Sequence, residues 1–139
     1  LSAILLAQLE EYEIITKKRK DICDFYFSYF SNKIINEYCY LPKISPNSKF
    51  NFHAFYIIFN SSKLAKQFIE HTKDRGVNCY IGYIPLHNSK KGKKLNLNEK
   101  LKNTEKYSKQ VVLLPLHTNI TKKDLNQIET VFNEFFIGT

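Results

Sequence analysis

Apolar residues follow two different periods along the chain, and these periods predict its helices and strands. Between residues 1 and 31 they recur at steps of three and four, which predicts one long amphipathic helix with a bend near Lys17–Lys20. Residues 61–74 form the next predicted helix, because a serine caps its start and a glycine follows its end. A short helix is predicted over 104–109, and a capping box at 121–124 begins the last helix.

Aromatic and β-branched residues mark three strands, over 51–59, 77–84 and 111–114. A proline follows the second and the third of these runs and stops them. Turn-forming residues predict an irregular connection over 32–49, and residues 90–98 are predicted to form a polar loop. The order of these elements indicates the α+β class, with a small sheet covered on one side by helices.

The size and composition are those of one folded domain. The chain has 139 residues, of which 43% are apolar and 24% charged, so collagen-like, low-complexity and disordered classes are excluded. No apolar run approaches the roughly 18 residues of a membrane span, and no leader pattern precedes the first helix. We expect a cytoplasmic protein with reduced thiols at Cys23, Cys39 and Cys79.

The beginning of the chain has an unusual pattern. The sequence contains no methionine, and its first predicted helix starts at Leu1 without a capping residue ahead of it. We therefore expect this chain to be the carboxyl-terminal piece of a longer protein.

The positive charge of the chain is concentrated in one segment. The formal net charge is +8, and eight lysines lie between residues 90 and 109 against Glu99 and Glu105. Such a segment attracts phosphate groups, although a solvated lysine-rich loop has the same pattern. Nucleic acid is the weaker interpretation, because arginine is scarce and the aromatic residues lie within predicted helices and strands.

No complete catalytic set is visible in the sequence. It has no P-loop, GxGxxG, HExxH or GxSxG motif. His87 and His117 could meet at neighbouring strand ends as part of a zinc site, but two polar strand ends are the simpler interpretation. Cys79 lies within a strand pattern and is predicted to be a core residue rather than a nucleophile.

The segment Gly82–His87 is the best candidate site. A strand there ends in Tyr83, a proline fixes the turn, and His87 follows immediately before the lysines. Phenol, imidazole and ammonium donors at one strand end suit a phosphate or a sugar. A strand that ends in a half-buried tyrosine is the alternative interpretation.

Five segments in order carry a family resemblance that runs almost the whole length of the chain. They are Leu1–Leu9, Lys17–Arg19, His53–Ile57, Gly82–His87, and Thr104–Lys106 with Leu113–Leu116. With these segments the chain resembles the carboxyl-terminal part of DegT/DnrJ-type nucleotide-sugar aminotransferases. It departs from that pattern at Gly82, where the family usually has histidine, and at Lys90-Lys91-Gly92, where "PAG" often follows.

The resemblance implies the small C-terminal domain of a fold-type-I transferase that depends on pyridoxal 5'-phosphate. Residues 1–31 would form an interdomain helix and residues 32–139 the small domain, with an antiparallel sheet. The large domain that binds the cofactor through a lysine would be absent from this chain, so the chain alone would be inactive. We therefore expect an exposed apolar face on residues 1–12, where that domain packs.

The resemblance also implies the substrates and the partners. The whole protein would act as a homodimer, without nucleic acid or membrane partners, and would transfer an amino group, commonly from glutamate, to a dTDP-4-keto-6-deoxyhexose. A 3-keto sugar nucleotide is an alternative substrate, and a non-enzymatic basic module that binds nucleic acid or an acidic partner is the alternative class. The residues expected to bind the sugar nucleotide are Tyr83, His87, Lys90, Lys91, Lys93 and Lys94.

Overall fold

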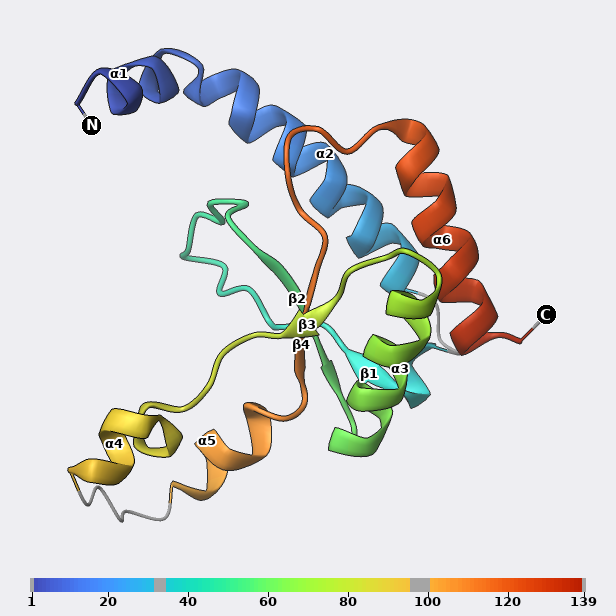
Figure 1. Ribbon diagram of the computed structural model, residues 1–139. Coiled ribbons are helices and arrows are strands. Elements are labelled where there is room, and N and C mark those ends of the chain that lie inside the picture. Colours follow the sequence, from blue (N-terminus) through green and yellow to red (C-terminus); the bar gives the residue numbers. More distant parts are fainter. Residues whose placement is uncertain (1, 32–34, 96–100, 139) are drawn as a thin grey trace.

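Figure 1 shows the computed structural model of the chain, which describes residues 2–31, 35–95 and 101–138. The helices in these ranges are α1 (Ser2–Glu10), α2 (Tyr12–Phe30), α3 (Ser62–Asp74), α4 (Lys90–Lys94), α5 (Lys102–Tyr107) and α6 (Lys122–Phe136). The strands are β1 (Cys39–Tyr40), β2 (Phe55–Phe59), β3 (Tyr80–Ile81) and β4 (Val111–Leu114), and the 3-10 turns are η1 (Ile35–Glu37) and η2 (Leu86–Asn88).

The four described strands form one antiparallel sheet in the order β1-β2-β4-β3. Strand β4 lies at its centre, because Leu114 pairs with Phe55 of β2 while Leu113 pairs with Tyr80 of β3. Helices α2, α3 and α6 cover one side of this sheet (Figure 1). The α+β class and the small antiparallel sheet covered by helices are thus confirmed.

Side chains along the strands alternate between the face of the sheet that the helices cover and the opposite face. Phe55, Ile57 and Phe59 are buried against the helices, whereas the residues between them are only partly buried. We call the other side of the sheet the open face. The residues on this face, assigned from the strand register and from their burial, are Tyr40, Tyr56, Ile58, Tyr80, Val111 and Leu113.

Aromatic rings fill the core between the sheet and the helices. Phe132 of α6 is fully buried, and its ring centroid lies 5.1 Å from that of Phe68 on α3 and 5.7 Å from that of Tyr29 on α2. The buried hydroxyl of Tyr26 donates a 2.8 Å hydrogen bond to the carbonyl oxygen of Pro115. Burial of these rings removes apolar area from water and so stabilises the fold.

The two helices with predicted caps begin where the sequence indicated. The Ser61 hydroxyl accepts a hydrogen bond from the backbone N–H of Leu64 at the start of α3. At the start of α6, Thr121 and Asp124 form the predicted capping box, in which each side chain accepts from the other's backbone N–H. Gly76 follows α3 with a φ of +78°, a conformation that favours glycine.

The N-terminal helix differs from the prediction in the position of its break. The helix is interrupted at Glu11, between α1 and α2, whereas Lys17–Lys20, where a bend was predicted, lies within the continuous helix α2. Leu5 and Leu9 of α1 are 57% and 59% exposed, and Tyr12 is also exposed. The expected exposed apolar face is therefore present. Among the described residues, no helix is long and apolar enough to cross a membrane.

Two predicted strands are shorter than expected. The strand predicted over 51–59 begins at Phe55, since Phe52 has a φ of +51° that interrupts extended backbone. The strand predicted over 77–84 is reduced to Tyr80–Ile81, which leaves Tyr83 beyond the strand.

Three other predictions need correction. The connection predicted as irregular contains η1 and the edge strand β1, which pairs with β2. The predicted polar loop contains helix α4 over Lys90–Lys94, and the short helix predicted at 104–109 is α5 over Lys102–Tyr107. Residues 32–34 of the connection and 96–98 of the loop lie outside the described residues.

Candidate functional site: the segment from Tyr83 to Lys94

The turn η2 and the helix α4 fold together as one structural unit, residues 86–94, which we call the η2–α4 unit. The Ser89 hydroxyl donates a 2.7 Å hydrogen bond to the Leu86 carbonyl oxygen and accepts a 3.0 Å hydrogen bond from the Gly92 N–H. Gly92 is buried, and a Cβ built there would lie 2.0 Å from the Leu86 carbonyl oxygen. Only glycine therefore allows α4 to lie this close to η2.

His87 is directed into the protein rather than toward solvent. Its side chain is 10% exposed, and its Nε2 atom lies 3.6 Å from the Oε1 atom of Glu105 on α5. That nitrogen is buried and has no hydrogen-bond partner among the residues that the structure describes. His87 thus links the η2–α4 unit to α5, and it reaches a ligand only through the segment that it holds.

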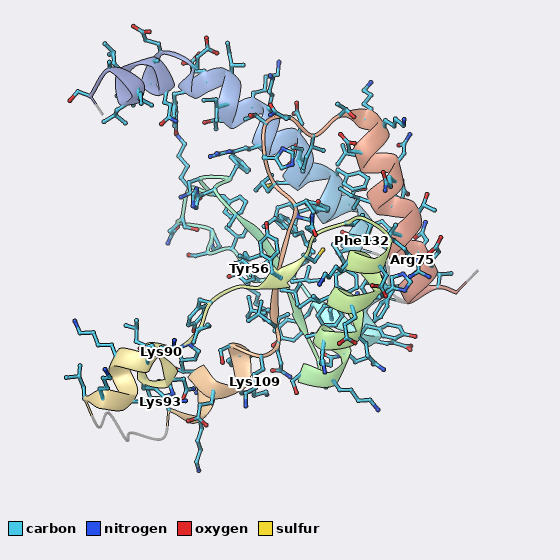
Figure 2. The ribbon with its side chains drawn as sticks, viewed as in Figure 1. Tyr56, Arg75, Lys90, Lys93, Lys109 and Phe132 are labelled. Atoms are coloured by element: carbon cyan, nitrogen blue, oxygen red, sulfur yellow. The ribbon has the colours of Figure 1, made fainter. Side chains whose placement is uncertain are left out.

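The other predicted site residues lie at the surface. Tyr83, between β3 and η2, is 55% exposed. The four lysines of α4 are exposed, whereas Gly92 provides the buried side of the helix. Figure 2 shows Lys90 and Lys93 on α4 and Lys109 beyond the end of α5, so the cationic side chains gather at one end of the molecule. The structure brings the lysines together on one short helix, and it separates the buried His87 from the exposed Tyr83.

The residues of this chain do not provide a site for pyridoxal 5'-phosphate. A lysine that binds this cofactor covalently needs a desolvated or charge-matched setting. Every lysine in the described ranges 2–31, 35–95 and 101–138 is exposed. The described lysines therefore do not fit a covalent site for this cofactor, and a cofactor lysine elsewhere in the protein stays a prediction.

The predicted zinc pair is not part of a metal cluster. His117 is exposed next to the loop before α6, whereas His87 is buried beside Glu105. No group of three or more potential metal ligands occurs within the described part of the chain.

The three cysteines are free and buried, as predicted for Cys79. Burial raises the pKa of Cys23 to about 11 and the pKa values of Cys39 and Cys79 to about 12. A raised pKa keeps the thiol protonated, so at pH 8 the reactive thiolate is scarcer than in an exposed cysteine by about two orders of magnitude or more.

We predict that a thiol reagent such as 5,5'-dithiobis(2-nitrobenzoate) leaves Cys23, Cys39 and Cys79 unmodified in the native protein at pH 8. Peptide mapping by mass spectrometry would locate any modification. In urea the same three residues should react fully, which provides the control. Rapid native modification of Cys79 would contradict its assignment to the core.

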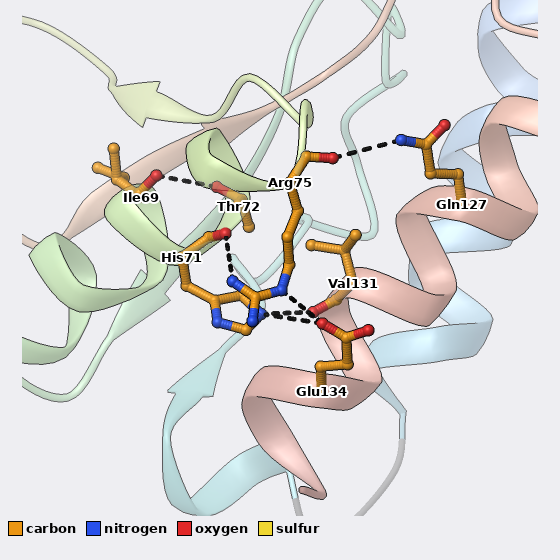
Figure 3. Close-up of polar contacts among 7 residues, drawn as sticks. All are labelled: Ile69, His71, Thr72, Arg75, Gln127, Val131 and Glu134. Carbon is orange, nitrogen blue, oxygen red and sulfur yellow. Dashed lines mark hydrogen bonds and ion pairs between the residues drawn. The ribbon is translucent and has the colours of Figure 1, made fainter. Parts of the chain in front are cut away.

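A second polar cluster joins α3 to α6 (Figure 3). The Nε2 atom of His71 lies 3.0 Å from the backbone carbonyl oxygen of Val131, and Arg75 donates a hydrogen bond to the Glu134 carboxylate. Gln127 donates a 3.3 Å hydrogen bond to the carbonyl oxygen of Arg75. Because each group is used to hold one helix against the other, this cluster fastens the fold and is not a candidate for catalysis.

Sequence reasoning missed three residues that shape the candidate site. Ser89 and Gly92 build the η2–α4 unit, and Glu105 lies beside His87. A serine three residues before a glycine, at the start of a lysine run, was the available signal for a capped helix. No signal in the sequence connected Glu105 to His87, because their contact depends on how α5 packs.

The arrangement resembles part of a known enzyme fold. Among solved structures, PseC of Helicobacter pylori, an aminotransferase of pseudaminic acid biosynthesis, is similar with a TM-score of 0.79 and 22% identity; the match covers 96% of this chain and 36% of PseC. The aminotransferase TlmJ of Streptoalloteichus hindustanus has a TM-score of 0.82 at 17% identity, over 94% of this chain and 34% of TlmJ. DesV of Streptomyces venezuelae has a TM-score of 0.81 at 18% identity, over 96% of this chain and 35% of DesV.

These likenesses define the class of fold: the chain has the fold of part of an aminotransferase. It spans about a third of the length of the similar solved structures. The model of the DegT/DnrJ/EryC1/StrS aminotransferase family matches residues 1–133. The chain therefore belongs to this family, whose members depend on pyridoxal 5'-phosphate. No curated protein sequence matches the chain.

Proposed function

We propose that the protein carrying this chain is a nucleotide-sugar aminotransferase, in which residues 1–31 lead from a large cofactor-binding domain and residues 32–139 form the small domain. The single observation that carries this proposal is the match of the aminotransferase family model to residues 1–133. The exposed apolar side chains of α1 support it, because a third-length piece of a similar enzyme should have surfaces that the remainder covers. A homodimer in the cytoplasm is part of the same proposal.

The substrate that we propose is a dTDP-4-keto-6-deoxyhexose, with glutamate as the amino donor. By the motifs in residues 53–57 and 82–87, the chain resembles dTDP-4-amino-4,6-dideoxygalactose transaminase, and this resemblance is the basis for the proposed sugar. The exposed lysines of α4 support a diphosphate-bearing substrate, because ammonium groups attract its negative charges. A 3-keto sugar nucleotide carries the same diphosphate, so it stays the alternative substrate.

The residues of this chain would bind and orient the sugar nucleotide. The four α4 lysines, Lys90, Lys91, Lys93 and Lys94, would attract the diphosphate, and the exposed phenol of Tyr83 would donate a hydrogen bond to the sugar or to a phosphate oxygen. His87 would act as a positioning residue, because its contact with Glu105 holds the η2–α4 unit against α5. The cofactor supplies the electron sink of the reaction when it is bound elsewhere in the protein.

The test is an amino-transfer assay on the full-length protein. The protein is incubated with pyridoxal 5'-phosphate, glutamate and dTDP-4-keto-6-deoxyglucose, and mass spectrometry follows the sugar nucleotide. We expect the keto oxygen to be replaced by an amino group, with one 2-oxoglutarate formed for each amino sugar. A 3-keto isomer is assayed in parallel, because its exclusive use would contradict the proposed ring position.

We predict that His87→Ala raises the KM for the sugar nucleotide about tenfold and leaves the KM for glutamate nearly unchanged. Loss of His87 releases the η2–α4 unit from α5, and an unanchored binding segment loses affinity by an amount of this order. Steady-state kinetics with each substrate varied in turn measure the effect. His117→Ala is the matched control, because His117 is exposed. Equal changes in the KM for the sugar nucleotide and the KM for glutamate would show that His87 does not position the sugar-nucleotide site.

The lysines leave one competing function to test. A non-enzymatic basic module would bind polyanions with an affinity that falls steeply as salt rises. Titration of the full-length protein with a 20-residue oligonucleotide at 50 and 200 mM NaCl measures this. We expect only weak binding, whereas tight, strongly salt-dependent binding without aminotransferase activity would favour the module.

A further inference from the structure

Two adjoining hollows lie between the start of α3, strand β3 and the end of α5, away from the side chains of α4. One has a volume of about 720 Å³ and the other about 320 Å³. Ser62, in the first turn of α3, and Lys109, beyond α5, line both of them. The two hollows therefore adjoin, and together we call them the α3–α5 depression.

The larger hollow has an apolar floor. Ile69 of α3 and Ile81 of β3 line it together with the side chains of Lys63 and Lys66. Ile81 is exposed at the edge of the sheet, where no described strand pairs beyond β3. A flat apolar group could cover these two isoleucines and remove them from water.

Lysines surround this floor and the smaller hollow. We call them the lysine cluster; its members are Lys63, Lys66, Lys102, Lys106 and Lys109. The two carboxylates that line the same surface are Glu70, which forms a 3.7 Å ion pair with Lys66, and Glu105, which lies beside His87. The five lysines outnumber these carboxylates, so the depression attracts anions. The N-terminal end of α3, a helix of 13 residues, adds partial positive charge at Ser62.

A buried amide group in the smaller hollow lacks a partner. Gln110 lines this hollow and is only 6% exposed. Its Nε2 atom donates a 3.0 Å hydrogen bond to the carbonyl oxygen of Asn60, whereas its Oε1 atom has no hydrogen-bond partner within the described residues. An acceptor left in this state is costly, because a buried polar group normally has a partner.

We propose that the α3–α5 depression binds a nucleoside phosphate. The base would cover Ile69 and Ile81, and the phosphates would lie among the lysine cluster and the first turn of α3. Two independent features support this ligand class: the apolar floor and the excess of lysine. The site differs from the one proposed for the sugar nucleotide, since its lysines come from α3 and α5 rather than from α4.

The test is isothermal titration calorimetry of the full-length protein with ADP, with adenosine and with inorganic pyrophosphate. We expect ADP to bind more tightly than either of the other probes, because only ADP uses both the floor and the lysine cluster. Lys109→Gln should weaken ADP binding about tenfold, the magnitude typical of a lost charge-assisted hydrogen bond. Ile81→Ser should weaken ADP binding and leave pyrophosphate binding unchanged.

Matched variants make the result specific. Lys122→Gln removes the same charge from an exposed position on α6 and should leave ADP binding unchanged. Circular dichroism melting curves show whether each variant is folded. Equal weakening by Lys109→Gln and Lys122→Gln would overturn the proposal, because it would show only a general effect of charge. Binding of ADP no tighter than pyrophosphate would also overturn it.

The remaining possible outcome is that the protein binds a longer nucleic acid. Affinity for a 20-residue RNA far above that for ADP, together with equal effects of Lys109→Gln and Lys90→Gln, would indicate a polyanion surface and overturn the proposal. If the protein does not bind ADP in this way, the proposed aminotransferase activity is unaffected. The two proposals are tested separately, because Lys109→Gln should retain the kcat/KM of the unmodified enzyme for amino transfer.

Discussion

Phe132→Ala is expected to lower the free energy of unfolding by about 3–5 kcal/mol, the range observed when a large buried aromatic residue is truncated. Phe132 is fully buried where α2, α3 and α6 meet, and its ring packs against Tyr29 and Phe68. Because these contacts come from three helices, no single side chain can move in to fill the space. Urea unfolding followed by circular dichroism measures the effect.

The matched control for Phe132→Ala is Ile137→Ala, since Ile137 lies just beyond the same helix but is exposed. We expect this variant to change the stability by less than about 0.5 kcal/mol. A loss below about 1 kcal/mol for Phe132→Ala would contradict the packing described for the core.

Gly92→Ala is expected to displace the η2–α4 unit and to raise the KM for the sugar nucleotide at least about tenfold. The added Cβ would lie 2.0 Å from the Leu86 carbonyl oxygen and 2.9 Å from the Cα atom of His87, and backbone cannot move aside as a flexible side chain can. Overpacking of this kind costs about 1–3 kcal/mol. The shift of the unit would move the α4 lysines and weaken the contact of His87 with Glu105.

Steady-state kinetics on the full-length protein measure the effect of Gly92→Ala. Gly138→Ala is the control for a glycine substitution outside the η2–α4 unit: its φ of +80° makes alanine strain the local backbone, but a Cβ there has no heavy atom within 4 Å. An unchanged KM for the sugar nucleotide in Gly92→Ala would show that the η2–α4 unit does not contribute to substrate binding.

The parts of the fold that could be predicted from the sequence are those in which local chemistry decides the structure. Ser61 and Thr121 begin α3 and α6 because their hydroxyls accept backbone hydrogen bonds from residues three positions further on. Strand β4 also lies where its apolar run predicts. In each case the signal and the structure that it produces lie within a few residues of each other.

The parts that could not be predicted depend on tertiary contacts. Strand β1 has only two residues, too few for an alternating pattern, and it exists because Cys39 and Tyr40 pair with β2. Helix α4 has no apolar period, because its buried side is the hydrogen atom of Gly92 against the backbone of η2. Strand β3 has only two residues because Tyr80 and Ile81 alone pair with β4, opposite Leu113 and Val112.

The sequence predicts the candidate site as one segment, within which the structure largely buries the side chain of His87 and exposes that of Tyr83. The sequence indicates that a proline ends the strand pattern before His87, and this predicts a turn there. It does not indicate which way the imidazole points after that turn. The side chain lies beside Glu105 because α5 packs there, and only the packing of α5 separates His87 from the exposed Tyr83.

Locating the cofactor in the full-length protein tests most directly whether this chain is one part of an aminotransferase whose reactive lysine lies elsewhere. The protein is loaded with pyridoxal 5'-phosphate, reduced with borohydride, digested and mapped by mass spectrometry. We predict one cofactor per chain, attached to a lysine outside residues 1–139, because every described lysine in this range is exposed. Attachment at any lysine of residues 1–139, or no attachment at all, would contradict the account.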